Sequence, residues 1–317
     1  MNRIKPAFIV LVILLGVSIF IAIFRNNSGR ITSLSASQAQ PHKVYLITMD
    51  KIDRHWYILD QGAADMAALL GIEYIWEAPE TRDNTKQIEL IYKAVEDGAD
   101  LILLAANDPL KLSYAIEDAK AKSVRFIYVD SPAYEEVITT LATNNYNAGI
   151  TAGETMLAEL DSAGISSGSI GIIGVSTVTN STMNREIGFR EAIGKDGRFL
   201  VLNTVYLNGD PLASEQAAAA MIAENSELVG LFGTNEGSTI GVGNAIGAVK
   251  PEIIGIGFDR SDEILAMIRD GRLKTVLTQN PYTMGYLGMA QAYAALEGKD
   301  TGPAEINTGI SLLRRRN

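Results

Sequence analysis

Four apolar stretches of this chain each end on a planar polar side chain. The stretches are YVD, FGTNE, GIGFD and LTQNP, and they place Asp130, Asn235, Asp259 and Gln279 at or just after β-rich runs. A parallel strand buried on both faces reads as a continuous apolar run, and open α/β sheets bind ligands at the carboxyl ends of such strands. Carboxylates and carboxamides offer hydrogen-bonding groups in fixed planar geometry. This chemistry suits a ligand rich in hydroxyl groups.

Local structural roles are the alternative for these residues. Asp is a favoured N-cap, so Asp259 could instead cap the helix expected over 261–269. Asn235 could form a turn, whereas Gln279 has no comparable turn role. Because the residues recur at strand tips, we favour ligand binding.

The elements that position them follow a regular alternation from Lys43 onward. The helices include 56–70, 84–97 and one beginning near Pro109. The expected strands are 44–49, 73–78, 101–106, 125–130, 169–175, 200–207, 228–234, 252–259, 273–280 and 306–313. Strands separated by helices indicate βαβ units and a parallel sheet. This number of strands is too large for one comfortable sheet, so the sequence predicts two doubly wound lobes that divide near residues 144–146.

Composition excludes several classes of function. The 317 residues include no cysteine, so neither a disulfide nor a thiolate nucleophile exists. The only histidines are His42 and His55, which lack partners for a metal site. Residues 50–317 hold 22 of the 27 basic residues and all 37 acidic ones, a balance of −15. So negative a net charge on residues 50–317 argues against nucleic acid as a partner.

The amino-terminal segment predicts a membrane helix. Pro6 to Phe24 is an uncharged, mostly apolar run of 19 residues, which as a helix spans roughly 28 Å, near the thickness of a bilayer core. We expect residues 1–25 to be an uncleaved anchor, with a cleaved signal peptide as the alternative. Residues 26–42 are polar and Ser-rich and predict a linker. The remainder is then expected on the extracytoplasmic side, either anchored or secreted.

Several motifs together resemble the periplasmic sugar-binding-protein family, and most closely its ribose- and galactose-type members. The resemblance covers residues 43–313 and rests on FGTNE, GIGFD, LTQNPYTMG, ATNNYNAG at 142–149 and NREIGF at 184–189. It implies two α/β lobes joined by three crossover strands. The crossings are expected near Asn144–Asn145, Gln279–Pro281 and Asn307–Ile310. The lobes would then be 43–144 plus 280–306, and 145–279 plus 307–317.

The resemblance also implies a set of sugar-binding residues. Asp130, Asn235, Asp259 and Gln279 match the family's sugar-binding acids and amides. The first loop offers a polar ligand and aromatic neighbours, and NREIGF contributes an arginine of uncertain role. These further positions are Asp53, His55, Trp56 and Arg185.

One of these positions has an alternative role, and two other positions depart from the family's pattern. Trp56 could pack as the first apolar residue of its helix instead of stacking on a sugar. The ribose-type proteins carry arginines where this chain has Ser131 and Met183. The identity of the sugar is therefore left open, with a small neutral sugar, a polyol or a furanosyl signal molecule as the candidates.

The expected function is ligand binding without catalysis and without a cofactor. The resemblance implies a solute-binding component of an ABC transporter, with a membrane permease as its partner. A membrane-anchored subunit that reports a sugar to a sensor histidine kinase is the alternative. A lower alternative is an NAD-dependent enzyme, which would share the alternation of strands and helices, and the glycines at 241, 243 and 247 are its one candidate motif. Their spacing does not match the dinucleotide-binding motif.

Overall fold

The structure, a computed structural model, describes residues 41–315 of the chain. The expected anchor or signal peptide at 1–25 lies outside these residues, as does the expected linker up to residue 40. Within 41–315, no helix combines the length and the apolar character needed to cross a bilayer. The described residues from His42 onward belong to one compact unit, and this unit contains two sheets.

The first sheet has six strands in the order β12-β5-β4-β3-β1-β2, and every neighbouring pair is parallel. Buried apolar side chains fill β1, β3 and β4, as expected for parallel strands covered on both faces. The strands are β1 (Lys43–Ile47), β2 (Glu73–Glu77), β3 (Leu101–Leu104), β4 (Arg125–Val129), β5 (Thr140–Ala142) and β12 (Glu305–Asn307).

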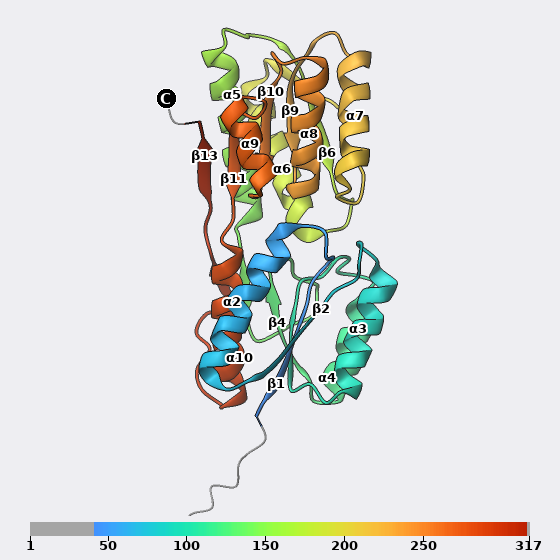
Figure 1. Ribbon diagram of the computed structural model, residues 1–317, viewed down its shortest axis with the longest axis vertical. Helices are drawn as coiled ribbons and strands as arrows, with labels where there is room; N and C mark the ends of the chain where they lie inside the picture. The colour runs from blue at the N-terminus through green and yellow to red at the C-terminus, as the bar shows by residue number, and fades with distance from the viewer. Residues whose placement is uncertain (1–40, 316–317) are drawn as a thin grey trace, which may run out of the picture. The chain divides into compact units, whose positions relative to one another are not determined.

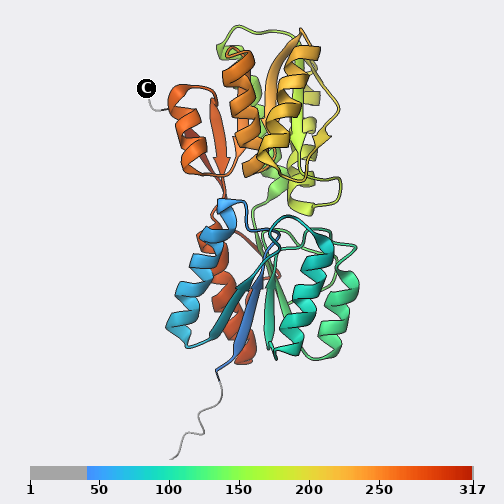
Figure 2. The same cartoon turned by 45° about the vertical axis from the view of Figure 1, so that its right-hand side comes forward.

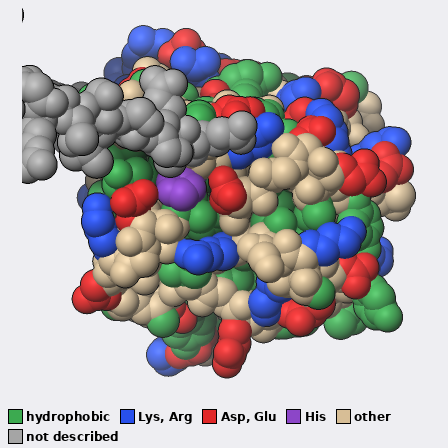
Figure 3. All heavy atoms as spheres, turned by 90° about the horizontal axis from the view of Figure 1, so that it is seen from below, with side chains coloured by type: hydrophobic (Ala, Val, Ile, Leu, Met, Phe, Trp, Pro, Cys, Tyr) green, Lys and Arg blue, Asp and Glu red, His purple; other side chains and the backbone are tan. Residues whose placement is uncertain are grey.

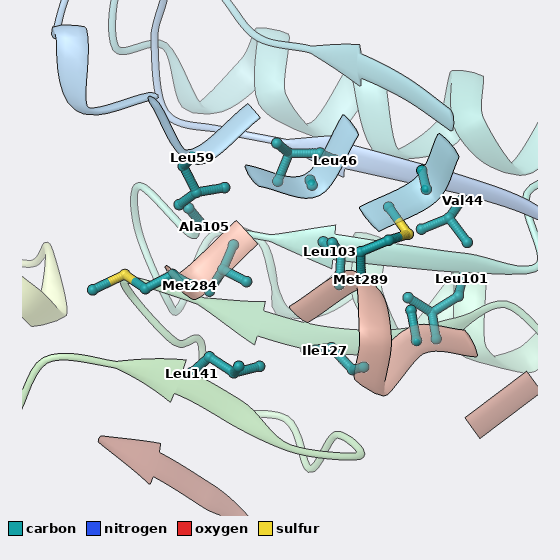
Figure 4. Packing of buried hydrophobic residues seen from close by; sticks show 14 of the residues in the cluster. Val44, Leu46, Leu59, Leu101, Leu103, Ala105, Ile127, Leu141, Met284 and Met289 are labelled. Atoms are coloured by element: carbon teal, nitrogen blue, oxygen red, sulfur yellow. The ribbon is translucent and has the colours of Figure 1, made fainter. Parts of the chain in front are cut away.

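Two pairs of helices cover this sheet, one pair on each face (Figure 1). Helices α2 (Arg54–Leu70) and α10 (Pro281–Leu296) pack on one face, and α3 (Asn84–Glu96) and α4 (Ser113–Ala121) on the other. Successive strand residues point to opposite faces. Figure 4 shows the first core, in which Leu59, Met284 and Met289 meet Val44, Leu46, Leu101, Leu103 and Ile127.

Helices α2 and α10 approach each other closely through glycines. A Cβ atom on Gly62 would lie 2.1 Å from the backbone oxygen of Tyr282, and one on Gly285 would lie 1.9 Å from that of Leu59. The first helix of the lobe is thereby fixed to a helix more than 200 residues later in the chain. This contact holds the start of α2, where His55 lies, against the rest of the lobe.

The second sheet has the order β13-β11-β10-β9-β6-β7, with β8 also paired to β6. All its pairs are parallel except β11 with β13, which is antiparallel. The strands are β6 (Gly168–Gly174), β7 (Phe199–Val201), β8 (Val205–Tyr206), β9 (Leu228–Gly233), β10 (Ile254–Phe258), β11 (Thr275–Thr278) and β13 (Ser311–Arg314).

Five helices cover the second sheet. Helices α5 (Asn145–Ser162) and α6 (Asn180–Asp196) share one core with the sheet. The other core lies beneath α7 (Pro211–Glu224), α8 (Glu236–Val249) and α9 (Asp262–Asp270). Each lobe is therefore a three-layer α/β sandwich, in agreement with the expected fold class.

The chain passes between the two lobes three times (Figures 1 and 2). The first passage follows β5 and leads into α5, the second joins β11 to α10, and the third joins β12 to β13. All three segments are short. Such segments are typical of hinges between domains.

Two expected strands are each divided in the structure. The run 200–207 forms β7 and β8, because both pair with β6 at different points while Leu202 to Thr204 lie between them. The run 306–313 forms β12 and β13, which belong to different sheets. Gly309, with φ of 73°, lies between them and permits the change of direction.

The surface at the end of the first lobe mixes charges of both signs. On the visible part of the face in Figure 3, Lys and Arg side chains lie among Asp and Glu side chains, with apolar atoms between them. The visible part of this face therefore presents no extended basic patch of the kind that binds a phosphate backbone.

Candidate ligand-binding site

Asp130 and Asp259 lie directly after the last residues of β4 and β10, one in each lobe. Both have left-handed backbone conformations, with φ of 63° and 73°. This region is uncommon for residues other than glycine, although Asp tolerates it better than most. Both side chains are buried. Backbone strain of this kind gathers at functional sites, which makes the two strand tips the natural centre of the candidate site.

His55 joins these carboxylates across the two lobes. Its Nε2 lies 3.0 Å from Asp130 Oδ2, and its Nδ1 lies 3.7 Å from Asp259 Oδ1. The first contact has ion-pair distance but lacks the alignment of a hydrogen bond. Burial alone would lower the pKa of His55, but Asp130 and then Asp259 raise it above its ordinary value. The positive imidazolium is therefore favoured between the two lobes.

Asp130 shows the reciprocal effect. Its burial would raise its pKa, but the neighbouring His55, with Arg185 and Arg82 further away, holds that pKa below its usual value. Asp130 is therefore an ionised acceptor in the site. This is the state in which a carboxylate accepts hydrogen bonds from hydroxyl groups.

Gln279 supplies a carboxamide beside Asp259. Its Nε2 donates to Asp259 Oδ1 at 2.7 Å. Its Oε1 is buried and has no hydrogen-bond partner among the described residues. Such an acceptor is costly to leave unpaired, so it is a suitable contact for a ligand donor.

Arg185 of α6 lies beside Asp259 and is 2% exposed. Its Nε donates to Asn145 Oδ1 at 2.8 Å, and its Nη1 donates to the Thr234 carbonyl at 2.9 Å. The guanidinium carbon lies 4.3 Å from the centre of the Phe258 ring, and Nη1 lies 3.9 Å from Asp259 Oδ2. These contacts fix the guanidinium of Arg185 beside Asp259. Direct contact of Arg185 with a ligand stays a prediction.

Asp53 and Asn235 form a second connection between the lobes. Asn235 Nδ2 donates to Asp53 Oδ2 at 3.1 Å. The Oδ1 atom of Asn235 accepts from the backbone N–H and the hydroxyl of Ser238, so Asn235 also caps α8. Burial and the nearby Asp50 raise the pKa of Asp53 to about 6, against the effect of Arg82.

Trp56 lies in the core of the first lobe and is 2% exposed. Its Nε1 donates to Asp50 Oδ2 at 3.2 Å, and its ring meets the His55 ring edge-on at a centroid distance of 4.8 Å. These contacts are those expected if Trp56 packs in the core as the first apolar residue of its helix. Stacking of Trp56 on a ligand stays a prediction.

Three residues of the site were not among the candidates from the sequence: Asp50, Arg82 and Glu236. Arg82 Nε lies 3.1 Å from Asp50 Oδ2, and its Nη2 donates to Asp53 Oδ2 at 3.1 Å. Glu236 Oε2 accepts from the backbone N–H of His55 at 3.3 Å. Asp50 follows an apolar strand as Asp130 does, so the same signal could have identified it. Arg82 comes from a loop without any such signal.

Two cavities adjoin this cluster, and residues of both lobes line each of them. One has a volume of about 190 Å³ and is lined by His55, Asp259 and Gln279 among others. The other has a volume of about 280 Å³ and is lined by Asp50, Asp53, Arg82 and residues 208–210. The candidate residues therefore form a polar cluster between the lobes. Among residues 41–315, no three His, Cys, Asp or Glu side chains are arranged to hold a metal ion.

Residues 44–300 match the sequence family described as the periplasmic binding protein domain. Because this match covers most of the chain, the protein belongs to that family. The resemblance seen in the sequence is thereby confirmed.

Individual relatives and solved structures agree with the family. The ribose import binding protein of Haemophilus influenzae is 23% identical, over 83% of this chain and 89% of the relative. The xylose/arabinose-binding protein of Sulfolobus acidocaldarius is 25% identical, over 81% of this chain and 67% of the relative. A carbohydrate-transporter solute-binding protein from Agrobacterium radiobacter, solved with D-arabinose, superposes with a TM-score of 0.83 at 26% identity. That match covers 87% of this chain and 95% of the other.

Proposed function

We propose that this protein binds a small neutral sugar or sugar-like ligand between its two lobes, as the solute-binding component of an ABC transporter. The observation that carries the proposal is the pair of buried carboxylates at strand tips of opposite lobes, with His55 between them. The sugars named for the relatives, which are ribose, xylose/arabinose and, in a solved complex, D-arabinose, support a sugar as the ligand.

The polar groups of the cluster suit the proposed ligand. Asp130 and Asp259 accept hydrogen bonds from hydroxyl groups, and Gln279 and Asn235 each carry both a donor and an acceptor. In this proposal Asp53, His55 and Arg185 complete or position the set, and Trp56 contributes its aromatic face. A sugar held in this way contacts both lobes at once.

Contacts with both lobes give the ligand a preference for the closed arrangement. A ligand shifts an equilibrium between two conformations only by its difference in affinity for them. Closure would occur about the three connecting segments. We propose that the lobes comprise 43–144 plus 280–306, and 145–279 plus 307–317. The packing of α10 against α2, and of β13 against β11, supports these bounds.

The proposed location is the extracytoplasmic face of a bacterial cell membrane. It is supported by the family and by the apolar run at 6–24, which would serve as an anchor or signal peptide. Retention of this segment would favour the alternative role, a membrane-anchored sensing subunit that signals to a histidine kinase. A transport role calls for a membrane permease as the partner.

The structure does not favour the alternative of an NAD-dependent enzyme, because its one candidate motif is not at a dinucleotide-binding turn. The glycines at 241, 243 and 247 lie inside α8, not in a turn between a strand and a helix. A Cβ on Gly241 would lie 2.4 Å from Ser214 Cβ, and one on Gly243 would lie 2.4 Å from Met267 Sδ. These glycines permit close packing around α8, so we propose a binding protein and not an NAD-dependent enzyme.

A thermal-shift screen tests the proposed function. The purified protein would be heated with pentoses, hexoses, polyols and furanosyl signal molecules at millimolar concentration. A ligand that binds only the folded state raises Tm by mass action, so we expect at least one sugar to raise it in a concentration-dependent way. If no compound in the panel shifts Tm, the sugar-binding proposal is wrong.

A further inference from the structure

Glu236 lies at the junction of the two lobes. It is the first residue of α8 and directly follows Asn235. Its side chain is 5% exposed. Its Oε2 accepts a hydrogen bond from the backbone N–H of His55, which belongs to the other lobe. The carboxyl group of Glu236 is therefore buried within the polar cluster.

The charged groups around Glu236 would not balance a negative charge on its carboxyl group. The charged groups that face it are Asp53 from the loop before α2, Asp259 from the end of β10, and His55 from α2. The two nearby arginines have other partners: Arg82 contacts Asp50 and Asp53, and Arg185 contacts Asn145 and Thr234. In the described part of the chain, no side-chain nitrogen of Lys, Arg or His lies within ion-pair distance of Glu236.

Such an environment favours the protonated form of the carboxyl. A buried carboxylate without a cation is costly, and two neighbouring acids add repulsion. Burial, followed by Asp53 and Asp259, raises the pKa of Glu236 to about 8. The geometry and the charges therefore point in the same direction.

We propose that Glu236 is a further ligand-binding residue that acts as a neutral carboxylic acid, donating its O–H to an oxygen atom of the sugar. A protonated carboxyl has one donor in addition to its acceptors. One oxygen of Glu236 already accepts from His55, which leaves the O–H for the ligand. Glu236 thus adds a donor to a site whose other acids accept. The inference rests on the proposed function.

The substitution Glu236→Gln separates this role from that of an ionised carboxylate. Glutamine has an acceptor oxygen and an NH₂ donor group but cannot ionise, whereas Glu236→Ala removes both kinds of group. Glu263→Gln is the matched control, because Glu263 is exposed in the first turn of α9 and undergoes the same chemical change. Binding of D-arabinose and D-ribose would be measured by calorimetry at pH 6 and pH 9.

The wild type should bind about tenfold more weakly at pH 9 than at pH 6, because one pH unit above a pKa leaves about a tenth of the acid protonated. E236Q should bind within about threefold of the wild type at pH 6 and lose this pH dependence, although His55 is intact. E236A should lose at least about tenfold in affinity at pH 6, and E263Q should match the wild type.

If E236Q loses as much affinity as E236A, the residue acts as an anion and the inference is wrong. Unchanged binding by E236A would also overturn it.

A second measurement needs no ligand and distinguishes the two possible failures. A carboxyl with a raised native pKa binds more protons in the folded than in the unfolded state between about pH 4.3 and its native pKa. The Tm of E236Q relative to the wild type should therefore rise from pH 5 to pH 9. If neither sugar binds but this trend appears, the choice of sugar is wrong and Glu236 is still protonated as inferred. A flat difference in Tm overturns the inference about Glu236 whether or not a sugar binds.

Discussion

Asp130 and Asp259 occupy equivalent positions in the two lobes. Each follows the last residue of a buried strand with a positive φ, and each backbone N–H donates to a carbonyl of the adjacent strand region, at Leu141 and Leu277 respectively. The same local device therefore delivers one carboxylate from each lobe to the cluster around His55. Because the device is a backbone conformation, its consequences for stability can be measured separately from binding.

The left-handed conformation at Asp259 predicts different effects of two substitutions. Asn tolerates this conformation and Ala does not, so Asp259→Ala should unfold with a free energy about 1 kcal/mol lower than Asp259→Asn. Denaturant unfolding of both variants measures the difference. At Asp262, in the first turn of α9, Ala should be no less stable than Asn, because the backbone there is helical. Equal stability of D259A and D259N would contradict the role of backbone strain.

His55 predicts a pH dependence of stability. Its folded-state pKa is raised above the ordinary value, so its stabilising contribution is complete below about pH 6.5 and is lost as pH rises through the folded-state pKa. The difference in free energy of unfolding between the wild type and His55→Gln should thus be larger at pH 5.5 than at pH 9. Guanidinium unfolding at both values checks this. In an Asp130→Asn background the pH dependence should shrink, and an unaltered one would rule out the proposed pairing.

The sequence predicted much of this site because its main signal is local. An apolar strand that ends on Asp, Asn or Gln can be recognised from a few adjacent residues, and the structure brings Asp130, Asn235, Asp259 and Gln279 into one cluster with Asp53 and His55. Whether each of them contacts the ligand stays a prediction. The two α/β lobes followed from the alternation of strands and helices, which is also a local pattern.

What the sequence did not predict depends on contacts between distant segments. Arg82 enters the site from a loop, and only the folded chain shows that it pairs with Asp50 and Asp53. Glu236 directly follows the predicted residue Asn235, but its lack of a cationic partner depends on how the two lobes surround it. The division of 306–313 into two strands depends on which sheet each half joins. Periodicity carries no information of this kind.

Arg185 predicts a large loss of stability on conservative replacement. Lysine cannot reproduce the planar contacts with Asn145, Thr234 and the Phe258 ring. Arg185→Lys should therefore lower the free energy of unfolding by about 3 kcal/mol. Arg260→Lys, on an exposed arginine, should change it by less than about 0.5 kcal/mol. Similar effects of the two substitutions would show that the contacts of Arg185 beside Asp259 do not stabilise the fold.

The close approach of α2 and α10 predicts that Gly285→Ala is destabilising. The new Cβ would lie 1.9 Å from the Leu59 backbone oxygen, so the helices must separate, at a cost of about 1–3 kcal/mol or more. Gly288→Ala in the same helix is the control, because its Cβ would meet only side-chain atoms at 3.2 Å and beyond. Thermal unfolding should rank G285A well below G288A. The reverse order would contradict the packing described for the first lobe.

A calorimetric titration of the sugar panel into the wild type, Asp130→Asn and Asp259→Asn tests whether the two strand tips hold one ligand between the lobes. Each substitution removes one buried charge from one lobe and keeps a side chain that tolerates the left-handed backbone. If one sugar binds between the lobes, the wild type should bind it, and each variant should bind it at least about tenfold more weakly. Wild-type affinity in either variant would show that the sugar is not held by both strand tips, and would contradict the account.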